Sequence, residues 1–242
     1  MKKILFAIAF VMLAVTAQAK TLIVYYSYTN NVERIVNDLR TQIEADVIEV
    51  EPAEKGLDYA ANNYAIGSAL IAAIRENPND AASYPAIDPV NVDMSKYSTI
   101  IIGTPLWWSN MAAPMQSFLF QYGKDMADKN IGLIVSSASS GISGVESDAK
   151  RLVPEGKFLS PSLWIRSSQT SNAKTLLQNW LQAIDYNNLP TGIDGIEKDL
   201  NTGITVYSLS GVNLHADAGS TATLPAGIYI INGRKTLVTR CE

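Results

Sequence analysis

Cysteine and histidine are almost absent from this chain of 242 residues, which has one of each. Cys241 is next to the last residue, so the chain has no internal disulfide. His215 lies far along the sequence from every loop that carries candidate site residues. A Ser-His hydrolase in the main domain, a Cys/His zinc site and a Cys-ligated iron–sulfur cluster are therefore nearly excluded. Chemistry here requires carboxylates, hydroxyls, a carboxylate-bound metal or an organic cofactor.

Positive charge and the common nucleotide motifs are also scarce. Lys and Arg number 19 against 23 Asp and Glu, which gives a formal charge of -4. No basic stripe is present, so we expect no nucleic-acid partner. Neither GxxxxGK[ST] nor GxGxxG occurs, which argues against a nucleoside triphosphatase loop and a dinucleotide fingerprint.

The first nineteen residues have the pattern of a signal peptide. Lys2 and Lys3 precede an apolar stretch over 4–15 that is too short to span a bilayer comfortably, and a small-x-small cleavage site follows at 17–19. We therefore expect a mature chain that begins at Lys20 and is exported, to the periplasm or to the medium or cell surface. No later stretch is apolar enough to predict a transmembrane segment in the mature chain.

Strand and helix patterns alternate over residues 20–188. Short apolar runs predict strands at 22–26, 46–50, 99–103, 130–136 and, interrupted by Pro161, at 157–159 and 162–165. Helical spacing or composition predicts helices at 32–39, 57–76, 114–121, 145–152 and 173–184. This alternation predicts an α/β domain with a mostly parallel sheet that helices cover on both faces.

The loop after the first strand has the composition of a phosphate site. Ser27, Tyr28, Thr29, Asn30 and Asn31 separate the strand from the first helix. A helix N-terminus has free N–H groups and favours an anion, and hydroxyls and amides add donors. The alternative is that these residues are ordinary helix caps.

The loop after the third strand contains two consecutive tryptophans, Trp107 and Trp108. Two consecutive side chains of an extended segment point to opposite sides, so at least one indole should line a surface or pocket. A planar aromatic ligand would suit that indole. The alternative is that one indole packs under the helix expected at 114–121 and that the other is half exposed.

A serine- and glycine-rich loop over 137–144 follows the fourth predicted strand. Glycine allows a backbone to approach a ligand closely. Because ligands of open parallel sheets bind beyond the carboxyl ends of the strands, we expect the 27–31, 104–111 and 136–144 loops to form one site.

Over residues 21–184 the chain resembles the flavodoxins, in particular short-chain flavodoxins with a Trp-Trp loop. The resemblance rests on YYSYTNNVERIV, IIIGTPLWWSNMAAPMQSFL and SSASSGISGVESD. It implies a flavodoxin-like, doubly wound, five-stranded parallel sheet of order 2-1-3-4-5 that binds FMN at its switch point, and it is the resemblance that supplies this order. It also implies electron or hydride transfer as a redox carrier or FMN-dependent reductase, with a redox partner protein or a small-molecule acceptor.

The resemblance also assigns residues. Ser27, Thr29, Asn30 and Asn31 would hold the phosphate through hydroxyls, amides and backbone N–H groups, and Val32 is also assigned to the cofactor site. The flavin ring would lie against the loop formed by Thr104, Pro105, Leu106, Trp107, Trp108, Ser109 and Asn110, and its other edge would meet Ser137, Gly141 and Gly144.

Two positions depart from the family's usual phosphate loop, Ser-x-Thr-Gly-Asn-Thr. Asn30 replaces the glycine, and Asn tolerates positive φ. Val32 replaces the last threonine, and one lost charged hydrogen bond is worth about 1.5–3 kcal/mol. That loss would weaken FMN binding about tenfold to a hundredfold. A degenerate flavodoxin-fold binding module without flavin is the alternative. A carboxylate-metal hydrolase would rest on Glu146 and Asp148 alone.

The C-terminal part has a different pattern. A polar linker over 189–203 leads into a small β-rich module over 204–242, in which Asn232-Gly233 is a hairpin signal. ITVYSLSGVNL and LPAGIYIINGRKTLV resemble the C-terminal sorting modules of secreted Bacteroidetes proteins. The alternative is a small hairpin that caps the main domain.

Overall fold

The computed structural model describes residues 20–189, 206–208, 227–231 and 234–238. The chain divides into two compact units, one within 1–193 and the other within 194–242. The predicted signal peptide, almost all of the predicted linker and much of the predicted β-rich module lie outside the described residues. Among the described residues, no helix has the length and apolar character needed to cross a membrane.

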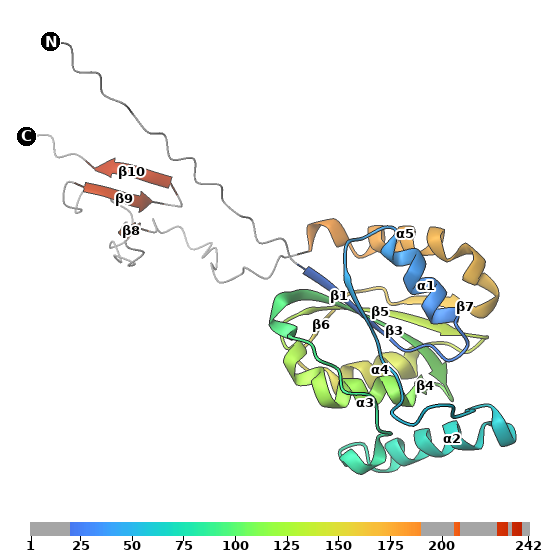
Figure 1. The fold of residues 1–242 in the computed structure, drawn as a ribbon. Helices are drawn as coiled ribbons and strands as arrows, with labels where there is room; N and C mark the ends of the chain where they lie inside the picture. The colour runs from blue at the N-terminus through green and yellow to red at the C-terminus, as the bar shows by residue number, and fades with distance from the viewer. Residues whose placement is uncertain (1–19, 190–205, 209–226, 232–233, 239–242) are drawn as a thin grey trace, which may run out of the picture. The chain divides into compact units, whose positions relative to one another are not determined.

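The first unit is built on a parallel sheet (Figure 1). Its strands are β1 (Lys20–Tyr25), β2 (Asp46–Glu49), β3 (Tyr97–Trp107), β5 (Asn130–Ser137), β6 (Lys157–Phe158) and β7 (Leu163–Arg166). They run in the order β2-β1-β3-β5, and β6 and β7 both pair with β5 in parallel. If β6 and β7 are taken as one fifth strand broken around Pro161, this is the predicted order 2-1-3-4-5.

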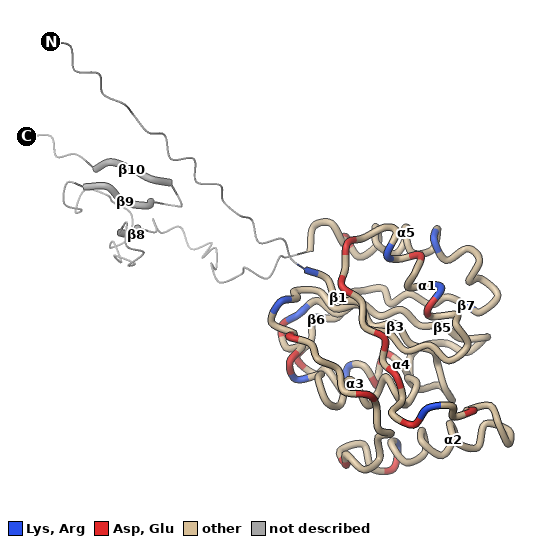
Figure 2. The backbone as a smooth tube through the Cα atoms, in the orientation of Figure 1, with Lys and Arg blue, Asp and Glu red and all other residues tan. Residues whose placement is uncertain are grey.

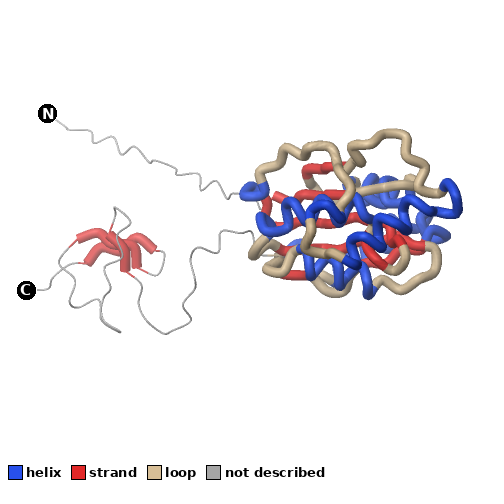
Figure 3. Tube along the Cα trace, turned by 90° about the horizontal axis from the view of Figure 1, so that it is seen from below, coloured by secondary structure: helices blue, strands red, loops and turns tan. Residues whose placement is uncertain are grey.

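Helices lie on both sides of the sheet (Figures 1 and 3). They are α1 (Asn31–Arg40), α2 (Ala61–Glu76), α3 (Ala113–Tyr122), α4 (Ser143–Leu152) and α5 (Ala173–Ala183). The short 3₁₀ helices are η1 (Ala81–Ser83), η2 (Met94–Lys96), η3 (Gly123–Met126), η4 (Ser167–Asn172) and η5 (Tyr186–Asn188). The predicted fold class, a doubly wound α/β sheet with helices on both faces, is confirmed.

The side chains of β1 show why the sheet is covered on both faces. Leu22 and Val24 belong to the core that α3 and α4 complete, whereas Ile23 and Tyr25 belong to the core that α1 and α5 complete. Successive strand residues point to opposite faces, so a run without charge buries both. Most charged residues lie on the helices and connections, and the central strands β3 and β5 contain none (Figure 2), whereas the edge strand β2 contains Asp46 and Glu49.

One local prediction was wrong. The third strand does not end at Gly103 but continues to Trp107 and forms a hairpin with β4 (Asn110–Met111). The turn residues Trp108 and Ser109 have φ values of 47° and 63°, the mirror-image conformation that two-residue hairpins require. This turn usually contains glycine or asparagine, so the sequence Trp-Ser gave no signal for it.

The helix expected at 57–76 begins four residues later, at Ala61. Its first turn is irregular, because Asn62, Asn63 and Tyr64 all have positive φ, between 51° and 62°. The segment before it therefore forms a loop over the carboxyl edge of the sheet, where Tyr59 and Ala60 lie near the first loop.

The second unit contains the strands β8 (Val206–Ser208), β9 (Gly227–Ile231) and β10 (Arg234–Val238), which form an antiparallel sheet of order β10-β9-β8. Ile231 pairs with Arg234, so two residues connect β9 and β10, as expected for a hairpin.

Candidate functional site

A cavity of about 610 Å³ lies at the carboxyl ends of β1, β3 and β5. Its lining comes from all three loops that the sequence singled out: Ser27, Tyr28, Thr29, Asn31 and Val32; Pro105, Leu106 and Trp107; and Ser136, Ser137 and Ala138. Ala60, Tyr64 and Ser167 complete it. This volume is typical of small-molecule sites, which range from about 300 to 1,000 Å³.

The first loop folds back on the N-terminus of α1. Asn30 has the left-handed conformation, with φ 60° and ψ 3°, and its side chain makes no capping hydrogen bond. The N–H of Glu33 donates to Ser27 Oγ at 3.3 Å. The N–H groups of Asn31 and Val32, in the same first turn, have no acceptor within the helix. This end of the cavity therefore offers backbone donors and a favourable dipole to an anion.

Hydroxyl and amide groups surround these backbone donors. Asn31 Nδ2 donates to Thr29 Oγ1 at 3.1 Å, and Thr170 Oγ1 donates to Asn31 Oδ1 at 3.4 Å. Among the described residues, no Lys or Arg lines the cavity. An anion bound here would be held by neutral donors and by the helix dipole.

Val32 is an apolar residue at the end of the cavity that lies beside the N-terminus of α1. It is 2 % exposed and belongs to the core between α1 and the sheet. A Cβ built on Gly103 would lie 3.2 Å from Val32 Cγ1, so the glycine of β3 allows this close packing. A valine therefore occupies a position from which a hydroxyl could reach the cavity.

Tyrosines surround Trp107. Its ring lies edge-on to Tyr26 and Tyr28, with centroid distances of 5.7 and 6.2 Å, and is tilted against Tyr59 at 4.9 Å. The indole is half-buried and packs against a small cluster formed by Ile71 and Ile74 of α2 and Ala113 of α3. Trp107 thus combines the two predicted roles, since it packs partly against a helix and also lines the cavity.

The hydroxyl of Tyr28 connects the first loop to the segment before α2. It donates to Asp58 Oδ1 at 2.7 Å and accepts from the Ala60 N–H at 3.0 Å. The hydrogen bond to Asp58 raises the pKa of Tyr28, and the same bond lowers the pKa of Asp58. Burial raises the pKa of Tyr26. These phenols therefore stay neutral at physiological pH.

Arg75 of α2 fixes the hairpin turn. Its Nη2 donates to the carbonyl oxygen of Trp108 at 2.6 Å, and its Nε donates to Asn110 Oδ1 at 2.8 Å. Asn110 Nδ2 and the Met111 N–H both donate to Asp148 Oδ2, at 2.8 and 3.0 Å. Asn110 and Asp148 thus hold the hairpin between α2 and α4.

Gly144 packs closely against the same hairpin. A Cβ built on Gly144 would lie 1.9 Å from the carbonyl oxygen of Ser109. The close backbone approach expected in this loop is therefore made to the hairpin turn. Gly141, in contrast, has nothing within 4 Å of a built Cβ.

The third loop begins at Ser137, whose hydroxyl is fully engaged. Ser137 Oγ accepts from Trp164 Nε1 at 2.8 Å and donates to the Ser140 carbonyl at 3.1 Å. The guanidinium of Arg166 lies 4.7 Å from the centre of the Trp164 ring. These contacts fix the backbone of the loop where it borders the cavity.

The cavity lining includes eight of the proposed site residues: Ser27, Thr29, Asn31, Val32, Pro105, Leu106, Trp107 and Ser137. It does not include Asn30, Thr104, Trp108, Ser109, Asn110, Gly141 or Gly144. Thr104 is fully buried and donates to the Pro105 carbonyl at 3.0 Å.

Three further lining residues, Tyr28, Ser136 and Ala138, lie in the predicted loops but were not assigned individually, whereas Ala60, Tyr64 and Ser167 lie outside those loops. Ser167 directly follows β7, so the rule that parallel strands end at one edge could have identified it. Tyr64 had no such signal, because it comes from an irregular helix start.

The fold and the cavity define a doubly wound α/β domain whose ligand site lies at the switch point of the sheet. Residues 20–184 match the model of the flavodoxin family, and the chain belongs to that family.

Solved structures with this fold include a candidate flavoprotein from Bacteroides eggerthii, at 21 % identity and TM-score 0.54, covering 69 % of this chain and 98 % of that one. A flavoprotein from Lactobacillus acidophilus in complex with FMN matches at 22 % identity and TM-score 0.51, covering 65 % of this chain and 99 % of that one. A search of curated proteins found no match.

Proposed function

We propose that this chain is an exported FMN-binding redox protein that transfers electrons or hydride. One observation carries the proposal: loops at the ends of three strands line a single cavity, together with a helix N-terminus whose Asn31 and Val32 N–H groups have no acceptor within the helix and with the indole of Trp107. FMN has a phosphate at one end and a flat ring at the other, which matches this arrangement. The complex of the Lactobacillus acidophilus flavoprotein with FMN supports the choice of ligand.

The residues present fit an FMN phosphate. The N–H groups of Asn31 and Val32 are free for it, and the hydroxyls of Ser27 and Thr29 lie beside them. Asn30 has the backbone conformation that a glycine would provide, so its replacement of the family's glycine does not disturb the turn. Leu106 and Trp107 provide an apolar wall for a flavin ring.

When bound, FMN supplies reversible uptake of one or two electrons, chemistry that needs no Cys or His from the protein. The part left to this chain is to bind, orient and shield the ring. Tyr26 and Tyr28 are neutral, and no cationic side chain among the described residues lines the cavity. The electron donor and acceptor would be a redox partner protein or a small molecule.

A titration of the chain from Lys20 onward tests the proposal, with FMN and with riboflavin, which lacks the phosphate. We expect FMN to bind and riboflavin to bind at least a hundredfold more weakly, because two or more charged hydrogen bonds at about 1.5–3 kcal/mol each are lost. Ser27→Ala should weaken FMN but not riboflavin. Ser147→Ala, which removes an exposed hydroxyl bonded within α4, is the matched control. A protein that takes up neither compound would refute flavin binding.

Such a refutation would favour the flavin-free binding module. Val32 is the observation that favours it, because it places a buried methyl group where a phosphate-binding hydroxyl is expected.

Among the described residues, no three His, Cys, Asp or Glu side chains lie close enough to hold a metal ion.

The pattern of residues 1–19 supports the proposal of export. N-terminal sequencing of the protein recovered from the periplasm or medium of a producing cell should give Lys20 as its first residue.

We also propose that residues 204–242 act as a sorting module. Deleting them should abolish surface attachment or release, whereas an unchanged distribution would favour a structural cap.

A further inference from the structure

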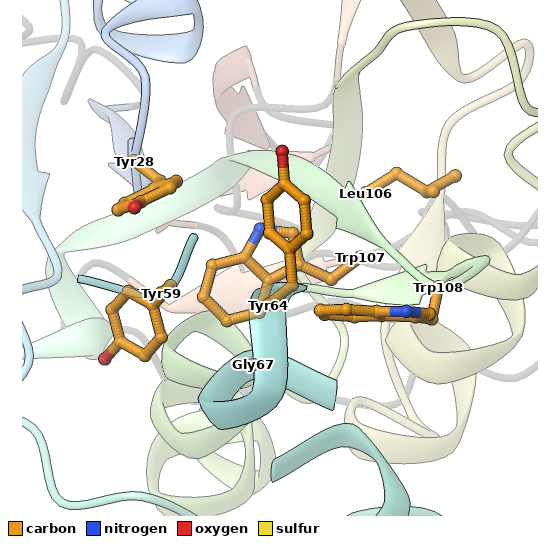
Figure 4. A pocket seen from close by; sticks show the side chains of 7 residues that line it. All are labelled: Tyr28, Tyr59, Tyr64, Gly67, Leu106, Trp107 and Trp108. Carbon is orange, nitrogen blue, oxygen red and sulfur yellow. The ribbon is translucent and has the colours of Figure 1, made fainter. Parts of the chain in front are cut away.

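A second, smaller cavity of about 300 Å³ adjoins the first one. Five aromatic side chains and one leucine dominate its lining: Tyr28, Tyr59, Tyr64, Trp107, Trp108 and Leu106 (Figure 4). It shares Tyr28, Tyr64, Leu106 and Trp107 with the larger cavity. Trp108 and Tyr59 line only the smaller one, so a second ligand could lie beside a ligand of the first.

The backbone holds Trp108 in this cavity at a cost. Trp108 has φ 47° at a turn position where glycine or asparagine is usual, and a left-handed conformation costs a bulky residue roughly 1–2 kcal/mol. Arg75 keeps the turn in place through the Trp108 carbonyl oxygen. Strain of this kind concentrates at ligand sites. The indole, and not the turn, is therefore what requires a tryptophan here.

Helix α2 makes room for the same indole. A Cβ built on Gly67 would lie 3.0 Å from both Cη2 and Cζ3 of Trp108. Glycine inside a helix costs about 1 kcal/mol relative to alanine. The turn and the helix thus both depart from their favoured residues so that one indole can lie on α2.

Trp108 is nevertheless not a core residue. It is 40 % exposed, and Tyr64, whose ring lies edge-on to it at 6.2 Å, is 52 % exposed. They are the two large hydrophobic side chains that stay exposed within residues 20–189, and both line this cavity. Tyr64 also has positive φ, 62°. Two costly, exposed aromatic rings at one cavity indicate a binding surface.

The lining indicates the class of ligand. It contains no charged side chain, and the two charged groups that hydrogen-bond to its lining residues are engaged there, Asp58 with Tyr28 and Arg75 with the hairpin. We propose that this cavity binds a planar, uncharged aromatic molecule of about two fused rings. Its position beside a flavin, as an electron acceptor would require, rests on the proposed function.

Calorimetric titration with 2-naphthol tests the proposal, on the chain from Lys20 onward in flavin-free and FMN-loaded forms. Naphthalene-2-sulfonate and tetramethylammonium serve as anionic and cationic probes. We expect 2-naphthol to bind both forms and naphthalene-2-sulfonate to bind at least tenfold more weakly, because no lining group compensates a buried negative charge. The aromatic faces can attract a cation, so tetramethylammonium binding more tightly than 2-naphthol would overturn the choice of an uncharged ligand. Binding to the flavin-free form alone would overturn the proposal, since the cavity would then belong to the flavin.

Substitutions in the turn test the contribution of the indole to binding separately from its effect on folding. Trp108→Gly suits the turn and should leave the protein folded while lowering 2-naphthol affinity at least tenfold. Trp108→Phe should keep affinity within a few-fold. Ser109→Gly relieves the same turn without touching the cavity and is the matched control. Unchanged affinity in Trp108→Gly would overturn the proposal. If FMN fails to bind but 2-naphthol binding depends on Trp108, the aromatic site stands and the proposed flavin function falls.

Discussion

Val32→Thr tests whether one missing hydroxyl limits the affinity for FMN. Val32 lies in the first turn of α1, lines the larger cavity and is 2 % exposed. Threonine has nearly the same shape, so the change places a hydroxyl beside the phosphate end of the cavity without altering the packing volume. Because the free N–H groups of this turn are already in place, the hydroxyl would add to an existing set of donors.

The expected gain is the value of one hydrogen bond to a charged group, about 1.5–3 kcal/mol. This corresponds to roughly a tenfold to hundredfold lower dissociation constant for FMN. The flavin-free protein should become less stable by about 1–3 kcal/mol, because a buried hydroxyl replaces a methyl group. Fluorescence titration measures the first quantity and urea denaturation the second.

Val36→Thr is the matched control. Val36 lies one turn further along α1, is 1 % exposed and belongs to the same core, but it does not line the cavity. It should lose similar stability and leave FMN affinity unchanged. The reasoning is refuted if Val32→Thr folds but binds FMN no more tightly than the original chain, or if both variants gain equally.

Three further substitutions test individual contacts. Asn30→Ala should lower thermal stability by about 1–2 kcal/mol, because alanine disfavours the φ of 60°, whereas Asn30→Gly should stay within a few tenths; equal losses would contradict the role of this backbone conformation. Gly144→Ala should cost about 1–3 kcal/mol in urea denaturation, because its Cβ would lie 1.9 Å from the Ser109 carbonyl oxygen; an unchanged midpoint would argue against this contact. Tyr59→Phe should raise stability by about 1–3 kcal/mol, since the buried Tyr59 hydroxyl has no partner among the described residues; a loss would mean that the hydroxyl is paired.

The sequence predicted the main sheet well because its strands are buried on both faces. Continuous apolar runs such as Ile100 to Ile102 and the helical stripe of Val32, Ile35 and Val36 leave few alternatives for local structure. The meeting of three loops also followed from a general rule about parallel sheets. Which loop residues face the cavity did not follow, since that depends on turn geometry.

The hairpin over 107–110 shows why the residues that face the cavity depend on turn geometry. Its turn requires positive φ at Trp108 and Ser109, and neither residue type signals such a turn. Without the hairpin, Thr104, Ser109 and Asn110 look like loop residues available to a ligand. In the structure, Thr104 is buried and Asn110 bonds to Arg75 and Asp148. Tertiary contacts to α2 and α4, distant in sequence, decide the outcome.

The two departures from the family's phosphate loop affect different properties, one the backbone conformation and the other the set of hydrogen-bond donors. Asn30 changes the residue but keeps the backbone conformation, so the helix N-terminus still faces the cavity. Val32 keeps the packing but removes a donor, and it completes the core between α1 and the sheet. The apolar side chain of Val32 thus stabilises this turn without a contribution from a phosphate. We therefore expect the protein to stay folded when a weakly bound flavin dissociates.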